Sequence, residues 1–264
     1  MVAEERIAKI LDYLDQHGVA KVQDLAELTD VSEMTIHRDL NKLAESDLLT
    51  KVHGGAVAKR VAEIPYRSRG IHNQTAKQAI AHAALSMIRP GMTLYLGPGT
   101  TITELARVLP IEGLKVITNS LPIAQELANL SQHEIILTGG TVRRHAEALV
   151  GPSAEATANE YFIHIAFIAT TGIDLDKGLT VYSKSEASVL QSFIKASRST
   201  ILLTDSSKFD KIMGPSAIPL YAIHKIICES KLPDKYQSYC DNNDIQIIVA
   251  NTSTNLGAEA EVSR

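Results

Sequence analysis

The segment from Ser32 to Leu43, SEMTIHRDLNKL, has the pattern of a helix with one apolar and one polar face. Ile36, Leu40 and Leu43 recur at i, i+4 and i+7, so they share one side of a helix and can bury against a core. Ser32 is expected to cap the helix. By itself the pattern also fits an ordinary amphipathic surface helix. The other side carries side chains that hydrogen-bond bases or phosphates, namely Glu33, Thr35, His37, Arg38, Asn41 and Lys42.

The neighbouring segments favour a helix-turn-helix over that alternative. A helix with aliphatic residues at helical spacing comes first, a second short helix is expected over 21–28, and residues 29–31 form a tight turn into 32–43. Residues 48–57 then read as two β-prone runs around a turn, which is the pattern of a wing. The sequence therefore predicts a winged helix-turn-helix over residues 1–57.

Such a domain predicts double-stranded operator DNA as a partner. The alternative, in which the domain binds another protein, is weakened because the polar face lacks aromatic anchors. Base contacts are expected from Thr35, His37, Arg38 and Asn41, and phosphate contacts from Lys42, Lys51 and His53. The full set of expected DNA contacts is Lys21, Val22, Ser32, Glu33, Met34, Thr35, His37, Arg38, Asn41, Lys42, Lys51 and His53.

These residues resemble the N-terminal signature of the DeoR-type bacterial transcription regulators. The wing sequence His-Gly-Gly-Ala-Val resembles that family as well, and most of its members have Arg at the position of His37. The resemblance implies a repressor of a carbohydrate-use operon that works as a homodimer or homotetramer. It is carried by Arg6, Ile10, Leu14, Ser32, Thr35, Ile36, His37, Arg38, Asp39 and Leu40.

Charge and composition narrow the function further. The first 60 residues contain eight Lys or Arg against eleven Asp or Glu, so the domain lacks the basic balance usual for a nucleic-acid binder and is expected to bind DNA non-specifically only modestly. No apolar run approaches the roughly 18 residues of a membrane span, and the N-terminus does not resemble a signal peptide. With only Cys228 and Cys240, neither a disulfide framework nor a metal site is expected. We therefore expect a cytoplasmic protein without membrane, metal or cofactor.

After a polar linker at 58–75, β-prone runs alternate with helical segments. This alternation predicts an α/β domain over 76–250 with a mainly parallel sheet, followed by a disordered tail at 251–264. The expected strands are 93–96, 114–118, 134–138, 163–170, 200–204, 225–228 and 245–249.

Five of these strands end in small and polar residues, at 97–101, 118–120, 138–140, 170–174 and 204–208. Each could be an ordinary turn. Parallel strands bring their carboxyl ends to one edge of a sheet, so the five are expected to form one binding cleft there. The loop at 97–101, GPGTT, lets a phosphate approach the backbone at a helix N-terminus.

The second half also resembles the DeoR-type family, whose C-terminal domain is similar to sugar-phosphate isomerases such as ribose-5-phosphate isomerase. This implies a phosphorylated sugar or related metabolite as effector, with Gly99, Thr100 and Thr101 on its phosphate. Gly97 stands where many members carry Asp. The expected effector residues are Gly97, Gly99, Thr100, Thr101, Asn119, Ser120, Gly139, Gly140, Arg143, Gly172, Glu186, Asp205 and Lys208.

The alternative to a DNA-binding regulator is an enzyme. A sugar-phosphate isomerase fused to a DNA-binding domain would need a base, an acid and an oriented lysine, for which Glu186, Asp205 and Lys208 are the available residues. Similarity of fold alone does not carry that activity, so the regulator is preferred.

Overall fold

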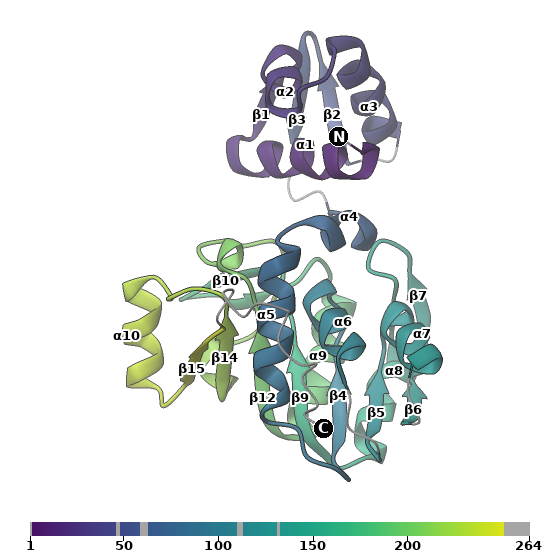
Figure 1. Cartoon of the computed structure of the whole chain (residues 1–264), viewed down its shortest axis with the longest axis vertical. Coiled ribbons are helices and arrows are strands. Elements are labelled where there is room, and N and C mark those ends of the chain that lie inside the picture. Colours follow the sequence, from purple (N-terminus) through teal and green to yellow (C-terminus); the bar gives the residue numbers. More distant parts are fainter. Residues whose placement is uncertain (1, 46–47, 59–62, 110–112, 131–132, 251–264) are drawn as a thin grey trace, which may run out of the picture.

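The computed structural model describes residues 2–45, 48–58, 63–109, 113–130 and 133–250. The chain forms a small N-terminal domain, called here the head (2–58), and a larger α/β domain, called the sheet domain (74–250). Between them residues 63–73 form a short segment that we call the joint. Figure 1 shows the head standing over the joint, with the sheet domain below. The tail expected at 251–264 lies outside the described residues.

The head has the three helices and the wing that the sequence predicts. A strand not foreseen, β1, pairs with β3, so the wing extends to an antiparallel sheet of order β1-β3-β2. The wing needs both its glycines, because Gly54 has φ 75° and a Cβ on Gly55 would lie 2.1 Å from the Ala20 carbonyl oxygen. The elements are α1 (Ala3–His17), β1 (Val19–Lys21), α2 (Val22–Thr29), α3 (Glu33–Glu45), β2 (Leu49–Val52) and β3 (Gly55–Ala58).

The apolar face of α3 forms part of the core of the head. Ile36, Leu40 and Leu43 are buried there, in the cluster that also holds residues of α1 and α2. The Ser32 hydroxyl accepts a hydrogen bond from the Thr35 backbone N–H at 3.3 Å, which confirms it as the cap. The spacing of aliphatic residues thus predicted the buried side of α3 correctly.

Two residues of the N-terminal signature hold α1 against α3. The Arg6 guanidinium donates to both carboxylate oxygens of Asp39, at 2.6 and 3.3 Å, and the Asp39 side chain is 4% exposed. A bidentate contact between a guanidinium and a carboxylate fixes the relative orientation of the two side chains. Arg6 and Asp39 therefore act within the fold of the head.

The joint packs against the head on one side and the sheet domain on the other. Its helix α4 (Tyr66–Ile71) contacts α1, and Ile64 packs against the core of the head. Toward the sheet domain, the Tyr66 hydroxyl is 2.5 Å from that of Thr103, and the Tyr66 N–H donates to the His145 carbonyl at 2.8 Å. Part of the segment expected as a polar linker is thus helical and packed.

The sheet domain contains the mainly parallel sheet that the sequence predicts. It has seven strands in the order β15-β14-β12-β9-β4-β5-β6. All six pairings are parallel. Its strands are β4 (Thr93–Leu96), β5 (Lys115–Thr118), β6 (Glu134–Leu137), β9 (Ile163–Ile168), β12 (Ser197–Leu203), β14 (Lys225–Cys228) and β15 (Gln246–Val249).

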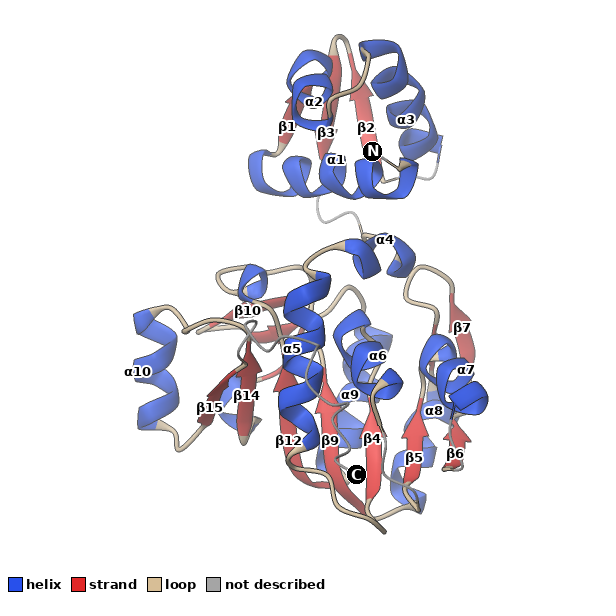
Figure 2. Ribbon diagram, viewed as in Figure 1, coloured by secondary structure: helices blue, strands red, loops and turns tan. Residues whose placement is uncertain are grey.

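Helices cover both faces of this sheet (Figure 2). Along β4, Leu94 and Leu96 join the apolar cluster under α5, α6 and α7, whereas Tyr95 joins the cluster under α8, α9 and α10. This alternation is what a strand buried on both faces requires. None of the helices in the described ranges is long and apolar enough to cross a membrane. The helices are α5 (Gln74–Leu85), α6 (Thr100–Arg107), α7 (Leu121–Leu130), α8 (Pro152–Thr157), α9 (Lys184–Lys195) and α10 (Asp234–Asn242).

Several short elements were not predicted. They form a two-stranded hairpin and a small antiparallel sheet of order β10-β11-β13. A strand of three residues is too short to show a period in its sequence. These elements are β7 (Thr141–Arg143), β8 (Ala148–Val150), β10 (Gly172–Asp174), β11 (Gly178–Thr180) and β13 (Ser216–Ile218), with 3₁₀ turns at Ala158–Glu160, Ser206–Lys208 and Leu220–Ala222.

We expect Asp39→Ala to lower the free energy of unfolding of the head by about 1–3 kcal/mol, because Arg6 loses a charged hydrogen-bond partner. Arg38→Ala, one position earlier but on the exposed side of α3, should change it by less than about 0.5 kcal/mol. Urea unfolding followed by circular dichroism measures both. Equal effects of the two substitutions would contradict the role given to Asp39.

Candidate functional site

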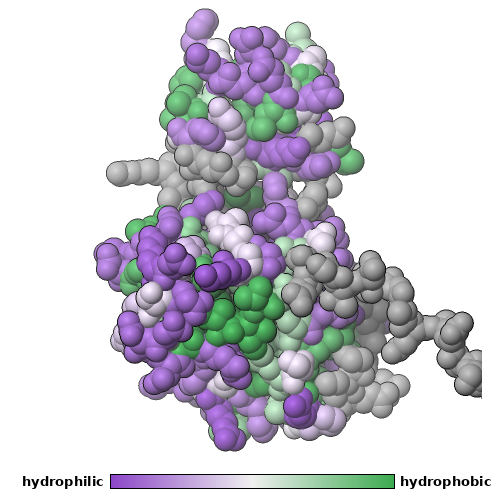
Figure 3. Space-filling view, turned by 60° about the vertical axis from the view of Figure 1, so that its left-hand side comes forward, coloured by the Kyte–Doolittle hydropathy of each residue, from purple (hydrophilic) through white to green (hydrophobic). Residues whose placement is uncertain are grey.

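The polar face of α3 and the wing form one exposed surface of the head. Met34, Arg38 and Lys42 are exposed on α3, and His53 is exposed in the turn of the wing. The same holds for Lys21, Ser32, Glu33, Asn41 and Lys51, while Thr35 and His37 are partly exposed. In the view of Figure 3, hydrophilic side chains cover much of the outer end of the head. Eleven of the twelve expected DNA contacts therefore have side chains at the surface.

One hydrogen bond ties the two parts of this surface together. The Lys51 ammonium of β2 donates to the Asn41 side-chain oxygen of α3 at 2.7 Å. This bond joins α3 to the wing.

Val22 is the exception among the expected DNA contacts. Its side chain is 4% exposed and belongs to the core of the head, and its N–H donates to the Gly54 carbonyl at 2.9 Å. We therefore correct that expectation. Val22 is a core residue that supports the wing.

A cavity lies at the carboxyl ends of the parallel strands, where the sequence places the effector. Its wall includes residues 97–101 after β4, Asn119 after β5, Thr170 and Thr171 after β9, and 204–208 after β12 apart from Ser206. The GPGTT loop meets the N-terminus of α6, and a Cβ on Gly99 would lie 2.7 Å from the Ala169 Cβ. Free N–H groups of such a helix end favour an anion.

Charged side chains line this cavity with an excess of positive groups. Four cationic residues, Arg69, Lys77, Lys208 and Lys211, face two carboxylates, Glu186 and Asp205. Apolar side chains complete the wall, among them Tyr95, Val181 and Leu190. The arrangement suits a small anion that also carries polar hydroxyl groups.

Lys77 is the residue of this site that sequence reasoning missed. It is 4% exposed on α5, and its ammonium donates to the Arg69 carbonyl at 2.5 Å. Burial lowers the pKa of Lys77 to about 8, and the nearby charges of Lys208 and Arg69 act in the same direction. A signal was present, because Lys77 shares its helix face with Ile80, Ala81 and Ala84.

Asp205 is the buried carboxylate at the end of β12. It accepts hydrogen bonds from the backbone N–H and hydroxyl of Ser207, and from the Asn73 amide at 3.2 Å. Burial acts to raise the pKa of Asp205, but the charges of Lys208 and Lys77 and the bonds from Ser207 outweigh it, so that pKa lies below its ordinary value. Asp205 therefore stays ionised beside two lysines.

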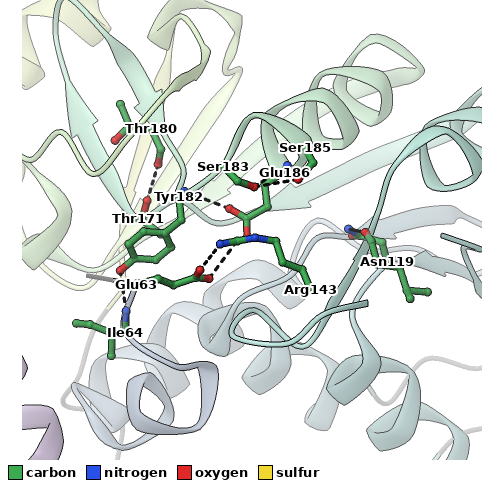
Figure 4. A network of polar contacts seen from close by, with 11 residues as sticks. Glu63, Ile64, Asn119, Arg143, Thr171, Thr180, Tyr182, Ser183, Ser185 and Glu186 are labelled. Atoms are coloured by element: carbon green, nitrogen blue, oxygen red, sulfur yellow. Dashed lines mark hydrogen bonds and ion pairs between the residues drawn. The ribbon is translucent and has the colours of Figure 1, made fainter. Parts of the chain in front are cut away.

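Arg143 links the cavity to the joint (Figure 4). Its guanidinium donates to Glu63 and to Glu186, and the other carboxylate oxygen of Glu186 accepts from the Tyr182 N–H at 3.1 Å. Burial raises the pKa of the Glu186 carboxyl, even though Arg143 acts to lower it. Of the three ion-paired side chains, only Glu186 lines the cavity.

The structure brings together eight of the thirteen residues expected at the effector site. Gly97, Gly99, Thr100, Thr101, Asn119, Glu186, Asp205 and Lys208 line the cavity. The amide of Asn119 is already used inside the fold, because it accepts from the Tyr95 hydroxyl and donates to the Leu149 carbonyl, both at 2.8 Å.

Five expected effector residues lie outside the cavity wall. Ser120 is fully buried beside Ala148, and Arg143 is held between two carboxylates. A Cβ on Gly140 would lie 2.6 Å from the Val150 carbonyl oxygen and one on Gly172 2.4 Å from that of Lys211, so these glycines serve close backbone packing. Gly139, beside Gly140, packs near Ser153 and is the fifth.

The joint supplies a part of the wall that sequence reasoning also missed. Ile64, Arg69, His72 and Asn73 all line the cavity. Arg69 lies 5.9 Å from the ring centres of both Tyr66 and Tyr182. A polar segment between two domains gave no sign that it would fold over the strand ends.

Comparison with known proteins gives matches over both domains. Residues 6–60 match the DeoR-like helix-turn-helix domain, and residues 72–230 match the DeoR C terminal sensor domain. The L-fucose operon activator of Haemophilus influenzae is 34% identical over 91% of this chain and 97% of its own. The putative aga operon transcriptional repressor of Escherichia coli O157:H7 is 30% identical over 87% of each. Among solved structures, ribose 5-phosphate isomerase A of Methanocaldococcus jannaschii overlaps 52% of this chain and 55% of its own, at 16% identity and a TM-score of 0.37.

Arg38→Ala should leave the fold intact and weaken binding to a DNA duplex selected from a random library by about 5- to 150-fold, because a base or phosphate contact worth about 1–3 kcal/mol is lost. Fluorescence anisotropy of labelled duplex measures it. Arg198→Ala, an exposed arginine of β12, removes the same charge far from the head and serves as the control. Undiminished binding by the Arg38 variant would remove Arg38 from the interface.

Proposed function

Because this chain belongs to the DeoR family of helix-turn-helix transcriptional regulators, we propose that it represses an operon for carbohydrate use and that a phosphorylated sugar or related metabolite in the cavity changes its affinity for DNA. The chain is thus a DNA-binding regulator. The proposal concerns whether it represses or activates, which effector it binds, and which residues contact the DNA and the effector.

The observation that carries the effector proposal is the composition of the cavity. Four cationic side chains face two carboxylates where the GPGTT loop enters α6, and Lys77 is buried among them. A phosphate would bind to the N-terminus of α6 through Thr100 and Thr101, with Lys208 and Lys77 balancing its charge. Asp205 and Glu186 remain as acceptors for sugar hydroxyl groups.

For the direction of regulation we propose repression. A head bound in the major groove of an operator covers the duplex and keeps polymerase from it. The relatives' names include an activator of an L-fucose operon and a repressor of an aga operon, so both activation and repression occur among proteins similar to this chain. For the groove we propose Thr35, His37, Arg38 and Asn41, and for the phosphates Lys42, Lys51 and His53.

The proposal includes a homodimer or homotetramer. A single head has more acidic than basic residues, so one copy gains little from the phosphates. Two heads on one repeated operator site would double the specific contacts.

Turnover of the sugar phosphate is not part of this proposal. Glu186, the carboxylate that an isomerase reaction would need as base, is ion-paired with Arg143 and hydrogen-bonded to the Tyr182 N–H. Asp205 is likewise occupied by Ser207 and Asn73. A base must reach the proton it removes, and these contacts hold both carboxylates in place.

We expect at least one of glucose 6-phosphate, fructose 6-phosphate, ribose 5-phosphate and glycerol 3-phosphate to raise the melting temperature of the full chain and to alter its affinity for the selected duplex. Lys208→Ala should lower the affinity for that ligand by about tenfold and leave DNA binding without ligand unchanged. Lys177→Ala, an exposed lysine in the turn before β11, is the control. Release of DNA by the Lys208 variant at the wild-type ligand concentration would refute the cavity as the effector site.

Effector affinity should fall by up to about tenfold between pH 7 and pH 9. Lys77, with a pKa of about 8, is mostly protonated at the lower pH and mostly neutral at the higher one, whereas a phosphate monoester is dianionic throughout because its second pKa is about 6. Calorimetric titration of the full chain at several pH values measures this. Lys77→Met should bind more weakly and lose the dependence; an equal slope in this variant would show that another group causes it.

A further inference from the structure

We propose that the joint is at once a wall of the effector cavity and the support of the head, and that Arg143, bridging Glu63 of the joint to Glu186 of the cavity, passes effector binding on to the head. This deepens the regulation proposed above and rests on it for the nature of the ligand. The mechanical connection itself rests on contacts within the chain.

Ile64 touches both domains. It packs against the apolar core of the head and also lines the cavity. Its N–H donates to the hydroxyl of Tyr182 at 3.5 Å, and Tyr182 lines the cavity as well (Figure 4). A ligand that moves Tyr182 therefore acts on a residue that the head rests upon.

The second connection is ionic. Arg143 of β7 donates to both carboxylate oxygens of Glu63, one of them at 3.0 Å, and to Glu186 at the start of α9. The three side chains are 21%, 11% and 16% exposed, so water screens them only partly. A ligand hydroxyl that donates to Glu186 competes with Arg143 for it, and this changes how firmly Arg143 holds Glu63, the neighbour of Ile64.

Arg69 provides a reason for the ligand to engage the joint directly. Its guanidinium lies over the rings of Tyr66 and Tyr182, and it lines the cavity. Its Nε is buried, and no hydrogen-bond partner for it is present among the described residues. A buried N–H without a partner is costly, so an anionic oxygen of the ligand would be favoured there.

These contacts imply two arrangements of the joint, one without ligand and one with it. Without ligand, Arg143 joins Glu63 to Glu186, and no described residue accepts a hydrogen bond from Arg69 Nε. With ligand, Glu186 and Arg69 gain new partners. Because α4 contacts α1, a change in the joint shifts the position of the head. A difference of contacts between two states is what coupling between two sites requires.

The test compares Glu63→Gln with Arg67→Gln in the full chain. Both remove one charge from an ion pair of the joint, but Arg67 pairs with Glu147 at 2.9 Å and is 83% exposed, away from the cavity. The readout is the ratio of DNA dissociation constants with and without saturating amounts of each of the four sugar phosphates, by fluorescence anisotropy. Circular dichroism melts check that each variant is folded.

We expect the wild type and Arg67→Gln to share one ratio, between about 5 and 150, and Glu63→Gln to bring it at least fivefold closer to 1. Glu63→Gln should still bind the sugar phosphate within about twofold of the wild type. A second variant, Tyr182→Phe, removes the hydroxyl that binds the Ile64 N–H and should also lower the ratio. Wild-type ratios in both Glu63→Gln and Tyr182→Phe would overturn the inference.

Hydrogen exchange of the ligand-free protein separates this inference from the effector proposal. The Ile64 amide, relative to its intrinsic rate in each sequence, should exchange at least fivefold faster in Glu63→Gln than in Arg67→Gln, because its N–H is less protected. Equal rates would overturn the connection whatever the ligand. If none of the sugar phosphates binds the wild type while the exchange rates differ as expected, the effector class is wrong and the connection stands.

Discussion

The parallel pairing of β4 with β9 on one side and with β5 on the other decides where this chain can bind a small molecule. Parallel strands all end at the same edge, so the turns after β4, β5, β9 and β12 meet although they are far apart in the sequence. An antiparallel sheet would send alternate turns to opposite edges. The N-terminus of α6, the buried Lys77 and the joint all lie where that edge places them.

This explains how much the sequence alone could predict. For buried strands such as Thr93–Leu96 and Lys225–Cys228, the predicted first and last residues agree with the structure. A continuous apolar run between polar turns fits few other elements. Thr100 and Thr101 were found by the same reasoning, since a glycine loop between strand and helix is a local signal. Lys77 and Arg69 were missed because a lysine in a helix and an arginine in a polar segment look like solvated residues. Their place in the cavity wall comes from the position of α4 and α5 beside the sheet edge, which is a property of the assembled fold.

The buried charges around the cavity work against stability and for function. Removing Lys77, Asp205, Glu186 and Arg143 from water costs free energy that their mutual contacts recover only in part. The shifted pKa values of Lys77 and Glu186, both caused first by burial, are the sign of that cost. Apolar side chains would fill the same space more stably. A ligand that supplies the missing charge and hydrogen bonds lowers the free energy of these buried charged side chains. In this way the binding of a small anion can change the balance between two conformations.

The head, in contrast, offers little to rearrange. Arg6 and Asp39 fix α1 against α3, and Lys51 ties the wing to Asn41 of the recognition helix. The aliphatic residues of the core beneath them are buried, and protein interiors of this kind are close-packed. Under the proposed function, a signal from the cavity would reach DNA as a change in where the whole head sits, and two heads on one operator would convert a small change of position into a mismatch with the spacing of the half-sites. That requirement places the control point at the joint, the segment that touches the head and the cavity together.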